Sequence, residues 1–388
     1  MASRNRVLAL LALAELLGMS VWFSASALAP QLARAWALTP AQAGWLTATV
    51  QLGFVAGTAA AALLNLADIV PLRVYFALAA LGASASNLAL LAAGGFAPAL
   101  VSRFATGFFL AGVYPPAMKM IATWYRDARG FAIGTIVGAL TVGKAMPYLV
   151  HGLERAGAAP VVGGASAAAA LAGVLVLAAY RDGPFPFARR PFAWSLVGTV
   201  LRHRPTRLAI GGYLGHMWEL YAMWTWIAAF LAAGAGLRAR AADVAGFAAI
   251  AVGGAGCVAG GWAADRWGRE RVTIWAMATS GSCAVLIGLG AGAPAVALAV
   301  ALAWGFSVVA DSAQFSALVT ELAPSHAVGT ALTLQTSLGF LLTLFSIQLV
   351  PHLVAAAGWR WAFVALAAGP ACGIAAMRRL GRLRSAVG

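Results

Sequence analysis

The sequence predicts an all-α integral membrane protein with twelve transmembrane helices in two six-helix halves. Of its 388 residues, 62% are hydrophobic and only 10% are charged, and the mean hydropathy is +0.86. A soluble domain carries about 25% charged residues. The 44 glycines suit membrane helices whose backbones approach closely. Apolar stretches of about 20 residues, the length of one bilayer crossing, recur along the whole chain.

Clusters of charged residues, proline and glycine separate these stretches and give the predicted spans. The first span contains Glu15 and is too long for the core of a signal peptide, so we expect it to be retained. The spans are 6–29, 41–65, 72–94, 97–122, 131–153, 160–180, 208–232, 241–263, 272–292, 294–319, 327–350 and 358–377.

The arginines predict the orientation of the chain. With both termini in the cytoplasm, 18 of the 24 arginines lie on the inner side, which is the asymmetry that orients helices during insertion. This distribution explains the net charge of +15 without a nucleic-acid partner. We therefore expect a monomer in a bilayer, most simply the inner membrane of a bacterium. The cysteines Cys257, Cys283 and Cys372 are odd in number and far apart, so neither a disulfide framework nor a metal or other cofactor is expected.

The chain divides into a first half at 1–180, a cytoplasmic linker at 181–207 and a second half at 208–388. The linker is rich in arginine and proline, and its apolar residues after Phe192 fit either a short helix at the membrane surface or a partly ordered loop. The two halves repeat weakly, with offsets of 197 to 199 residues that are typical of internal duplication. The repeating pairs are Asp68 with Asp265, Gly107 with Gly305, and Gly130 with Gly329.

A charged motif lies between the eighth and ninth predicted spans. It begins at Gly261 and continues with Asp265, Arg266, Gly268 and Arg269, so that an acid at a helix end meets a glycine turn and basic residues. This motif resembles the loop motif of the major facilitator superfamily, and twelve spans with a central linker agree with that family. The resemblance implies the superfamily fold and a loop that gates the carrier.

The copy of this motif in the first half is incomplete. It keeps Asp68 and Arg73 but lacks the first glycine, the basic residue after the acid and the turn glycine. In the fourth span, Arg103 and Gly107 resemble a fourth-helix motif of the family that is associated with proton coupling. The Gly-Pro pair of drug antiporters is absent, because Met146 precedes Pro147, and the second span lacks the arginine of nitrate carriers.

Four ionisable residues fall deep inside predicted spans. Glu15, Lys144 and Glu219 lie near the middle of the first, fifth and seventh spans, and Asp311 lies in the cytoplasmic half of the tenth. A charge at the bilayer centre costs at least about 2.5 to 3.5 kcal/mol, so each needs a partner, a wet cavity or a function. The resemblance implies that these helices line one central cavity.

Lys144 is the strongest candidate for a functional residue, because the chain has only two lysines. Thr141, Lys144, Tyr148 and His151 recur at helical spacing and predict a polar stripe on the fifth span. Lys144 could contact the solute or form a structural ion pair with Glu15 or with an acid of the second half.

The remaining candidates also have two interpretations each. Glu15 could carry a proton or serve as a permanent counter-ion for Lys144. His216 and Glu219 are three residues apart and could relay protons or pair for packing, and Asp311 could line the cavity or join helices. Substrate contacts are expected at Tyr114, where the prolines that follow predict a helix break, and at the aromatic residues Trp218 and Trp304.

These features predict a secondary transporter that moves a small organic anion or zwitterion by alternating access, coupled to protons. The alternatives are a proton-coupled exporter of amphipathic drugs, a copper-type metal importer that uses methionines and His216, and a receptor or assembly factor that moves no solute. The sequence has no HExxH, GxSxG or P-loop pattern, so an enzyme is not expected.

Overall fold

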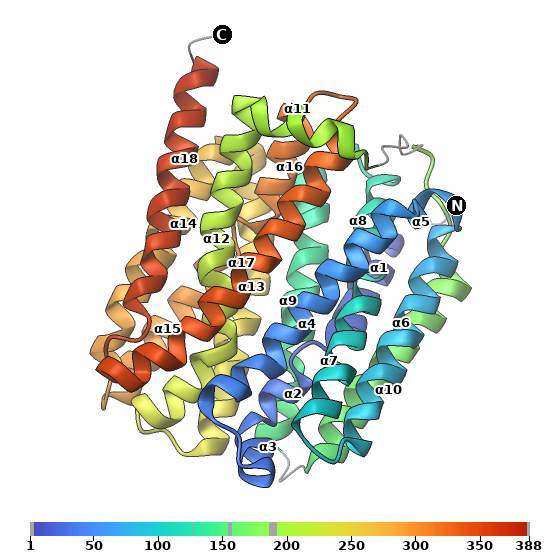
Figure 1. Cartoon of the computed structure of the whole chain (residues 1–388). Coiled ribbons are helices and arrows are strands. Elements are labelled where there is room, and N and C mark those ends of the chain that lie inside the picture. Colours follow the sequence, from blue (N-terminus) through green and yellow to red (C-terminus); the bar gives the residue numbers. More distant parts are fainter. Residues whose placement is uncertain (1–3, 127, 154–156, 186–191, 386–388) are drawn as a thin grey trace.

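The computed structural model describes residues 4–126, 128–153, 157–185 and 192–385, without the side chains of Asp68 and Ser385. They form a bundle of helices joined by short connections (Figure 1). The first helix begins and the last helix ends at the same end of this bundle, which we call the termini end. The opposite end is the far end.

The first-half helices precede residue 180 and include several that are broken inside a predicted span. They are α1 (Arg4–Met19), α2 (Ser24–Ala27), α3 (Ala29–Trp36), α4 (Pro40–Leu63), α5 (Leu66–Ile69), α6 (Leu72–Leu88) with the 3-10 turn η1 (Ala89–Ala92), α7 (Phe96–Leu110), α8 (Tyr114–Ala122), α9 (Arg129–Leu153) and α10 (Ala158–Ala179).

A short connecting helix and the second-half helices follow. They are η2 (Trp194–Leu196), α11 (Val197–Arg202), α12 (Arg204–Ala229) with the π-turn η3 (Phe230–Gly234), α13 (Ala239–Trp267), α14 (Arg269–Leu286) with η4 (Ile287–Gly290), α15 (Pro294–Val308), α16 (Ser312–Leu322), α17 (Val328–Ala357), η5 (Val364–Ala367) and α18 (Ala368–Ser385).

The predicted all-α membrane fold is confirmed. Within the described residues, nine helices or helix pairs are long and apolar enough to cross a bilayer. The other three predicted spans coincide with α1 and α2, with α12 and η3, and with η5 and α18. Length or composition explains the difference, since α1 has only 16 residues, α12 carries buried ionisable residues and α18 ends in arginines.

Helix packing follows the same plan in both halves. In the first half α4 packs on α7, α6 on α10, and α1 on α9 and α10. In the second half α13 packs on α15, α14 on α18, and α12 on α17 and α18. Two pairs join the halves, α9 with α13 and α4 with α17.

Glycines allow the closest of these approaches. A methyl group added at Gly107 of α7 would overlap the carbonyl oxygen of Val50 on α4. The corresponding contact in the second half places Gly305 of α15 against the carbonyl oxygen of Ala249 on α13. The two glycines that the sequence pairs therefore make equivalent contacts, since each brings a helix backbone directly onto its neighbour.

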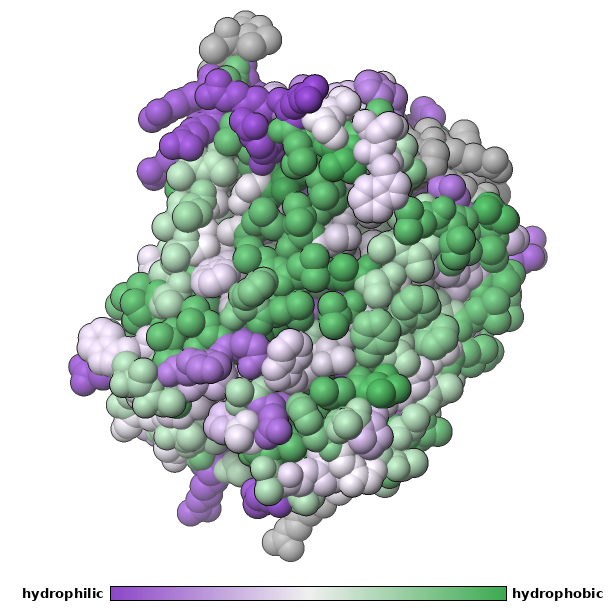
Figure 2. Space-filling view, viewed as in Figure 1, coloured by the Kyte–Doolittle hydropathy of each residue, from purple (hydrophilic) through white to green (hydrophobic). Residues whose placement is uncertain are grey.

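Polar and apolar residues separate on the surface. On the face in Figure 2, hydrophobic side chains cover the middle of the bundle and hydrophilic ones gather at the termini end. The exposed arginines of α18 lie at that end, namely Arg378, Arg379, Arg382 and Arg384. This distribution is typical of a protein whose apolar belt lies in lipid, and the chain is an integral membrane protein.

Of the two alternatives for the linker, the structure has a short helix, formed by η2 and α11. α11 packs against α12 and α17 across the termini end (Figure 1). Val200 of α11 is buried, and the backbone N–H of Ala193 donates a 3.0 Å hydrogen bond to Thr330 Oγ1 of α17. The part of the predicted linker at 186–191 lies outside the described residues.

Replacing Gly107 tests the α4–α7 packing. Gly107→Ala forces α7 away from Val50, and overpacking of this kind costs about 1–3 kcal/mol, so thermal unfolding in detergent should shift to lower temperature. Gly164→Ala on the exposed face of α10 is the control, because an added methyl group there meets nothing within 4 Å. Alanine favours helix, so the control should be unchanged or more stable. Equal melting of both variants would contradict close packing of α7 on α4.

Candidate functional site

Trp22 lies in a break in the first span, between α1 and α2. Carbonyl groups at such a break lose their helical donors and need others. Arg103 of α7 supplies them, because its guanidinium donates to the carbonyl of Val21 at 3.1 Å and to that of Trp22. It also donates to Ser24 Oγ at 3.2 Å and to Asn87 Oδ1 at 2.8 Å. A fully buried arginine therefore fixes the break and the position of Trp22.

Lys144 of α9 is buried at the centre of the bundle, with 3% of its surface exposed. Its Nζ lies 4.0 Å from the ring centroid of Trp22, 4.9 Å from that of Tyr221 and 5.5 Å from that of Trp224. Lys144 Nζ also donates a 2.5 Å hydrogen bond to the Tyr221 hydroxyl. We call Trp22, Tyr221 and Trp224 the aromatic cage. Its rings come from both halves of the chain, because Tyr221 and Trp224 belong to α12.

Two further rings cover the aromatic cage. Phe54 of α4 lies 5.4 Å from Trp22, and Phe340 of α17 lies 5.3 Å from Tyr221, between ring centroids. Phe54 and Phe340 contact each other at 4.5 Å. The α4–α17 pair that joins the halves thus closes one side of the cage.

Glu15 of α1 and Tyr148 of α9 bring further polar atoms into this interior. Glu15 is fully buried, and neither of its carboxylate oxygens has a hydrogen-bond partner in the described part of the chain. It attracts Lys144 electrostatically. The hydroxyl of Tyr148 is likewise buried without a partner among those residues. Buried polar groups are usually satisfied, so this concentration marks a candidate functional site.

The residues of the predicted stripe on α9 differ in their contacts. Thr141 Oγ1 donates to the carbonyl of Val137 in its own helix at 2.8 Å. His151 Nδ1 lies 2.8 Å from Asp243 Oδ2 of α13, at the far end of the bundle. Lys144 and Tyr148 remain as the polar members among the central rings. The sequence did not predict Asp243, because nothing in its local sequence identifies a partner on another helix.

Glu219 of α12 has donors for both of its carboxylate oxygens. Ser280 Oγ donates to Oε2 at 2.8 Å, and Trp304 Nε1 donates to Oε1 at 2.7 Å. Trp218 Nε1 donates to the carbonyl of Ala365 at 3.2 Å. These contacts join α12 to α14, α15 and η5, so Glu219, Trp218 and Trp304 are held within the second half.

His216 and Asp311 form a second buried pair in that half. His216 Nδ1 lies 2.9 Å from Asp311 Oδ1, and both residues are almost fully buried. Asp311 occupies the break between α15 and α16. Tyr114 begins α8 at the corresponding break of the first half, and Pro115 lies in the first turn of this helix, where proline is tolerated. The breaks in the fourth and tenth spans therefore occur at equivalent places.

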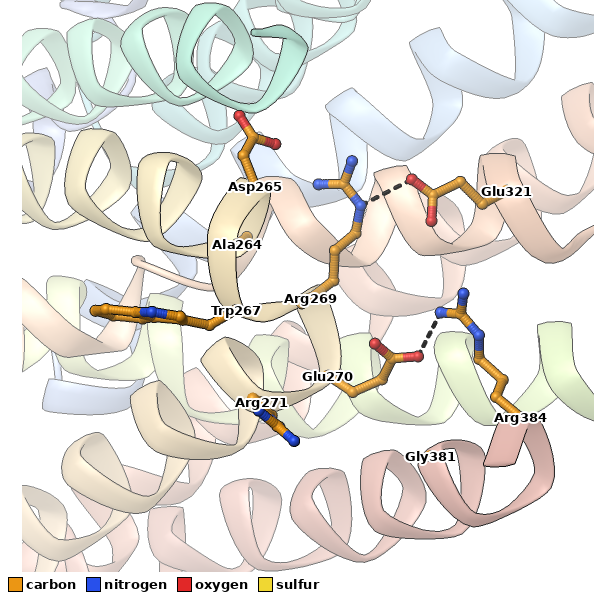
Figure 3. Close-up of a pocket in the computed structure, with 10 residues that line it drawn as sticks. Ala264, Asp265, Trp267, Arg269, Glu270, Arg271, Glu321, Gly381 and Arg384 are labelled. Atoms are coloured by element: carbon orange, nitrogen blue, oxygen red, sulfur yellow. Dashed lines mark hydrogen bonds and ion pairs between the residues drawn. The ribbon is translucent and has the colours of Figure 1, made fainter. Parts of the chain in front are cut away.

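The charged motif lies at the termini end of α13 (Figure 3). A methyl group added at Gly130 would overlap the carboxylate of Asp265, so this carboxylate lies against the first turn of α9. A helix N-terminus favours a negative charge. Asp265 of the second half thus contacts a first-half helix.

Charged residues of the same motif make three different contacts. Arg269 Nε donates to Glu321 Oε1 at 2.8 Å, and Arg384 Nη1 donates to Glu270 Oε1 at 2.5 Å. These pairs line an open pocket of about 610 Å³. The guanidinium of Arg266 lies 3.9 Å from the ring centroid of Trp262. At the turn, Gly268 has a φ of +88°, which suits glycine.

The first-half copy of the motif is held differently. Arg73 lies in the first turn of α6. Lys119 Nζ of α8 donates to the carbonyl of Ala67 at 2.8 Å. The side chain of Asp68 lies outside the described residues.

Arg103 gives a test of how the cage is positioned. Arg103→Gln would leave several buried carbonyl and amide oxygens without donors, at about 1–3 kcal/mol each, so unfolding in detergent should lose roughly 3 kcal/mol or more. Arg103→Lys keeps the charge but not the forked geometry and should recover only part of this loss. Arg34→Gln, at an exposed site on α3, is the control. Wild-type stability of Arg103→Gln would contradict the role assigned to this side chain.

Comparisons with known proteins agree with this architecture. The solved structure of a bacterial homolog of the human lysosomal transporter Spinster, inward-facing and unoccupied, aligns with a TM-score of 0.73 and 18% identity. Its inward-facing and occupied conformation aligns with a TM-score of 0.73 and 17% identity. Both alignments cover 98% of this chain and 97% of the other. A search of curated protein sequences found no match.

The family comparison covers most of the sequence. Residues 10–347 match the sequence profile of the Major Facilitator Superfamily. The prediction of a transporter rather than an enzyme is confirmed by this match and by the transporter fold of the neighbours. The chain belongs to the major facilitator superfamily.

Proposed function

We propose that this transporter moves a small organic anion or zwitterion by alternating access and that a proton accompanies the solute in symport. The observation that carries the proposal is the position of Lys144, which is buried among aromatic rings, and of Glu15, which is fully buried and attracts it. Buried charges in a membrane helix are costly and are kept where they have a partner or a function.

The site involves both halves of the chain. Lys144 and Trp22 belong to the first half, whereas Tyr221 and Trp224 belong to the second. In transporters built from repeats, the solute lies between the repeats and their rocking exposes it to one side at a time. We assign the rocking bodies to 1–180 and 208–388, joined by 181–207, and the recurring helix pairs support this division.

The chemistry of the two side chains suggests the solute and the coupling ion. The amine of Lys144 can hold a carboxylate, and Tyr148 offers a hydroxyl in the same interior. Glu15 has no donor for its oxygens among the described residues, so it is the residue we assign to proton binding. His216 and Asp311 remain candidates for carrying a proton within the second half. Coupling requires only that proton and solute shift the same equilibrium between conformations.

The orientation is part of the proposal. The termini end carries the exposed arginines of α18 and the charged motif, so we assign it to the cytoplasm. On this assignment the His151–Asp243 pair is extracytoplasmic, and Asp265 against α9 is the cytoplasmic gate. A monomer in a bacterial inner membrane, without a nucleic-acid partner, fits this arrangement.

Glu15→Gln tests the coupling. In proteoliposomes with an imposed proton gradient, wild-type protein should accumulate at least one compound from a panel of labelled propionate, lactate, glycine, β-alanine and 4-aminobutyrate. Glu15→Gln keeps the size of the side chain but cannot release a proton, so accumulation should fall at least tenfold while exchange of internal for external solute continues. Asp182→Asn, at an exposed residue of the linker, is the control and should accumulate normally.

Two results would contradict the proposal. One is the absence of flux for every compound of the panel in the wild type. The other is gradient-driven accumulation by Glu15→Gln at the wild-type level, which would place proton binding elsewhere.

A further inference from the structure

We propose that the aromatic cage is an ammonium-binding site, that Lys144 occupies it in the solute-free carrier, and that the solute displaces Lys144 with an ammonium group of its own. This inference rests on the proposed function and narrows the solute to a small zwitterion with a primary ammonium. Lys144 itself is then a tethered substitute for the solute.

The geometry of the cage favours a cation. Lys144 Nζ lies 4.0 Å from the ring centroid of Trp22 and 5.5 Å from that of Trp224, and it meets Tyr221 at the hydroxyl, 4.9 Å from the ring centroid. A cation within about 6 Å of an aromatic centroid is attracted by the ring, most strongly when it is desolvated. Lys144 is almost fully buried in this cage, and the Tyr221 hydroxyl accepts its hydrogen bond. Clusters of this kind recognise ammonium ligands in other proteins.

Polar atoms near the cage are available to a second ligand. The indole N–H groups of Trp22 and Trp224 are buried without acceptors in the described part of the chain. Both oxygens of Glu15, a residue with no exposed surface, are without donors there. A ligand carrying both an acceptor and an ammonium group could use these atoms, whereas Lys144 alone satisfies only the Tyr221 hydroxyl.

A zwitterion can use both charged positions of this interior. With Lys144 in the cage, the buried interior contains one amine and, in Glu15, one carboxyl group that attracts it. A zwitterion adds no net charge to this interior, because its ammonium takes the cage and its carboxylate can pair with the displaced Lys144. A simple anion has no group that can replace Lys144 in the cage.

The same arrangement explains how an empty carrier could close. Trp22 approaches from the first half and Tyr221 and Trp224 from the second, and a cation between them draws the rings together. Lys144 provides that cation when no solute is present. The halves could therefore meet at the centre in both the empty and the loaded carrier.

Chemical complementation tests the cage directly. Lys144→Ala removes three methylene groups and the amine, and these atoms correspond to propylammonium. Purified Lys144→Ala should unfold at lower temperature than wild type, and propylamine hydrochloride should restore at least half of the difference. We expect a dissociation constant at least tenfold lower than that of 1-propanol for the same variant, with sodium chloride matching the ionic strength. The wild type, whose cage is filled, should bind propylammonium at least tenfold more weakly.

Two variants serve as matched controls. Lys144→Met keeps most of the side-chain volume without a charge, so propylammonium should not stabilise it. Adding Trp22→Leu to Lys144→Ala removes the nearest ring and should abolish the rescue. Equal stabilisation of Lys144→Ala by 1-propanol, or no rescue by propylammonium, would overturn the inference.

A second measurement uses the wild-type protein and keeps the test independent of how well the variants fold. Glycine, β-alanine and 4-aminobutyrate are compared in thermal unfolding with acetate, propionate and butyrate, which lack the ammonium group. At least one zwitterion should raise the unfolding temperature more than its matched carboxylate does. Equal or greater stabilisation by the carboxylates would overturn the ammonium site while leaving the proposed anion transport intact.

Discussion

The arrangement of this carrier depends on one buried amine. Lys144 cannot enter the middle of a bilayer without compensation, and the compensation comes from rings and a carboxylate on other helices. Because the rings belong to the α1–α2 connection on one side and to α12 on the other, satisfying the amine brings the two halves together. The break between α1 and α2, and Arg103 which holds it, place Trp22 for this purpose.

Contacts between the halves occur at three levels along α9. The carboxylate of Asp265 lies against its first turn at the termini end, the aromatic cage holds Lys144 in the middle, and His151 meets Asp243 at the far end. Between these levels, glycines such as Gly138 bring the backbones of α9 and α13 close. Opening either end would break one charged contact while the centre keeps the halves together, which is the mechanical requirement of alternating access.

The sequence predicted the fold and the depth of the charges more fully than it predicted their partners. Spans could be identified because each needs an apolar stretch of fixed length, and the motif near Asp265 indicated the family. The partners of Lys144 could not be identified, since Trp22 and Tyr221 lie far apart in the chain and meet only through helix packing. The hydrogen bonds of Glu219 with Ser280 and Trp304 could not be predicted for the same reason.

The contacts of Arg103 could not be predicted from the sequence for a different reason. Its motif resembles one associated with proton coupling, whereas its contacts in the structure are with backbone carbonyls and Asn87. The break that requires those contacts contains neither proline nor glycine at residues 20–23, so no local signal could have predicted it.

A double-mutant cycle between Lys144 and Tyr221 tests the central claim most directly. Lys144→Met, Tyr221→Phe and the double variant are compared by their unfolding free energies in a detergent titration. If the amine of Lys144 in the first half is hydrogen-bonded to the hydroxyl of Tyr221 in the second, the two effects will be non-additive by about 1 kcal/mol or more. Additive effects would show that Lys144 does not join the halves through Tyr221 and would contradict the central role of this amine.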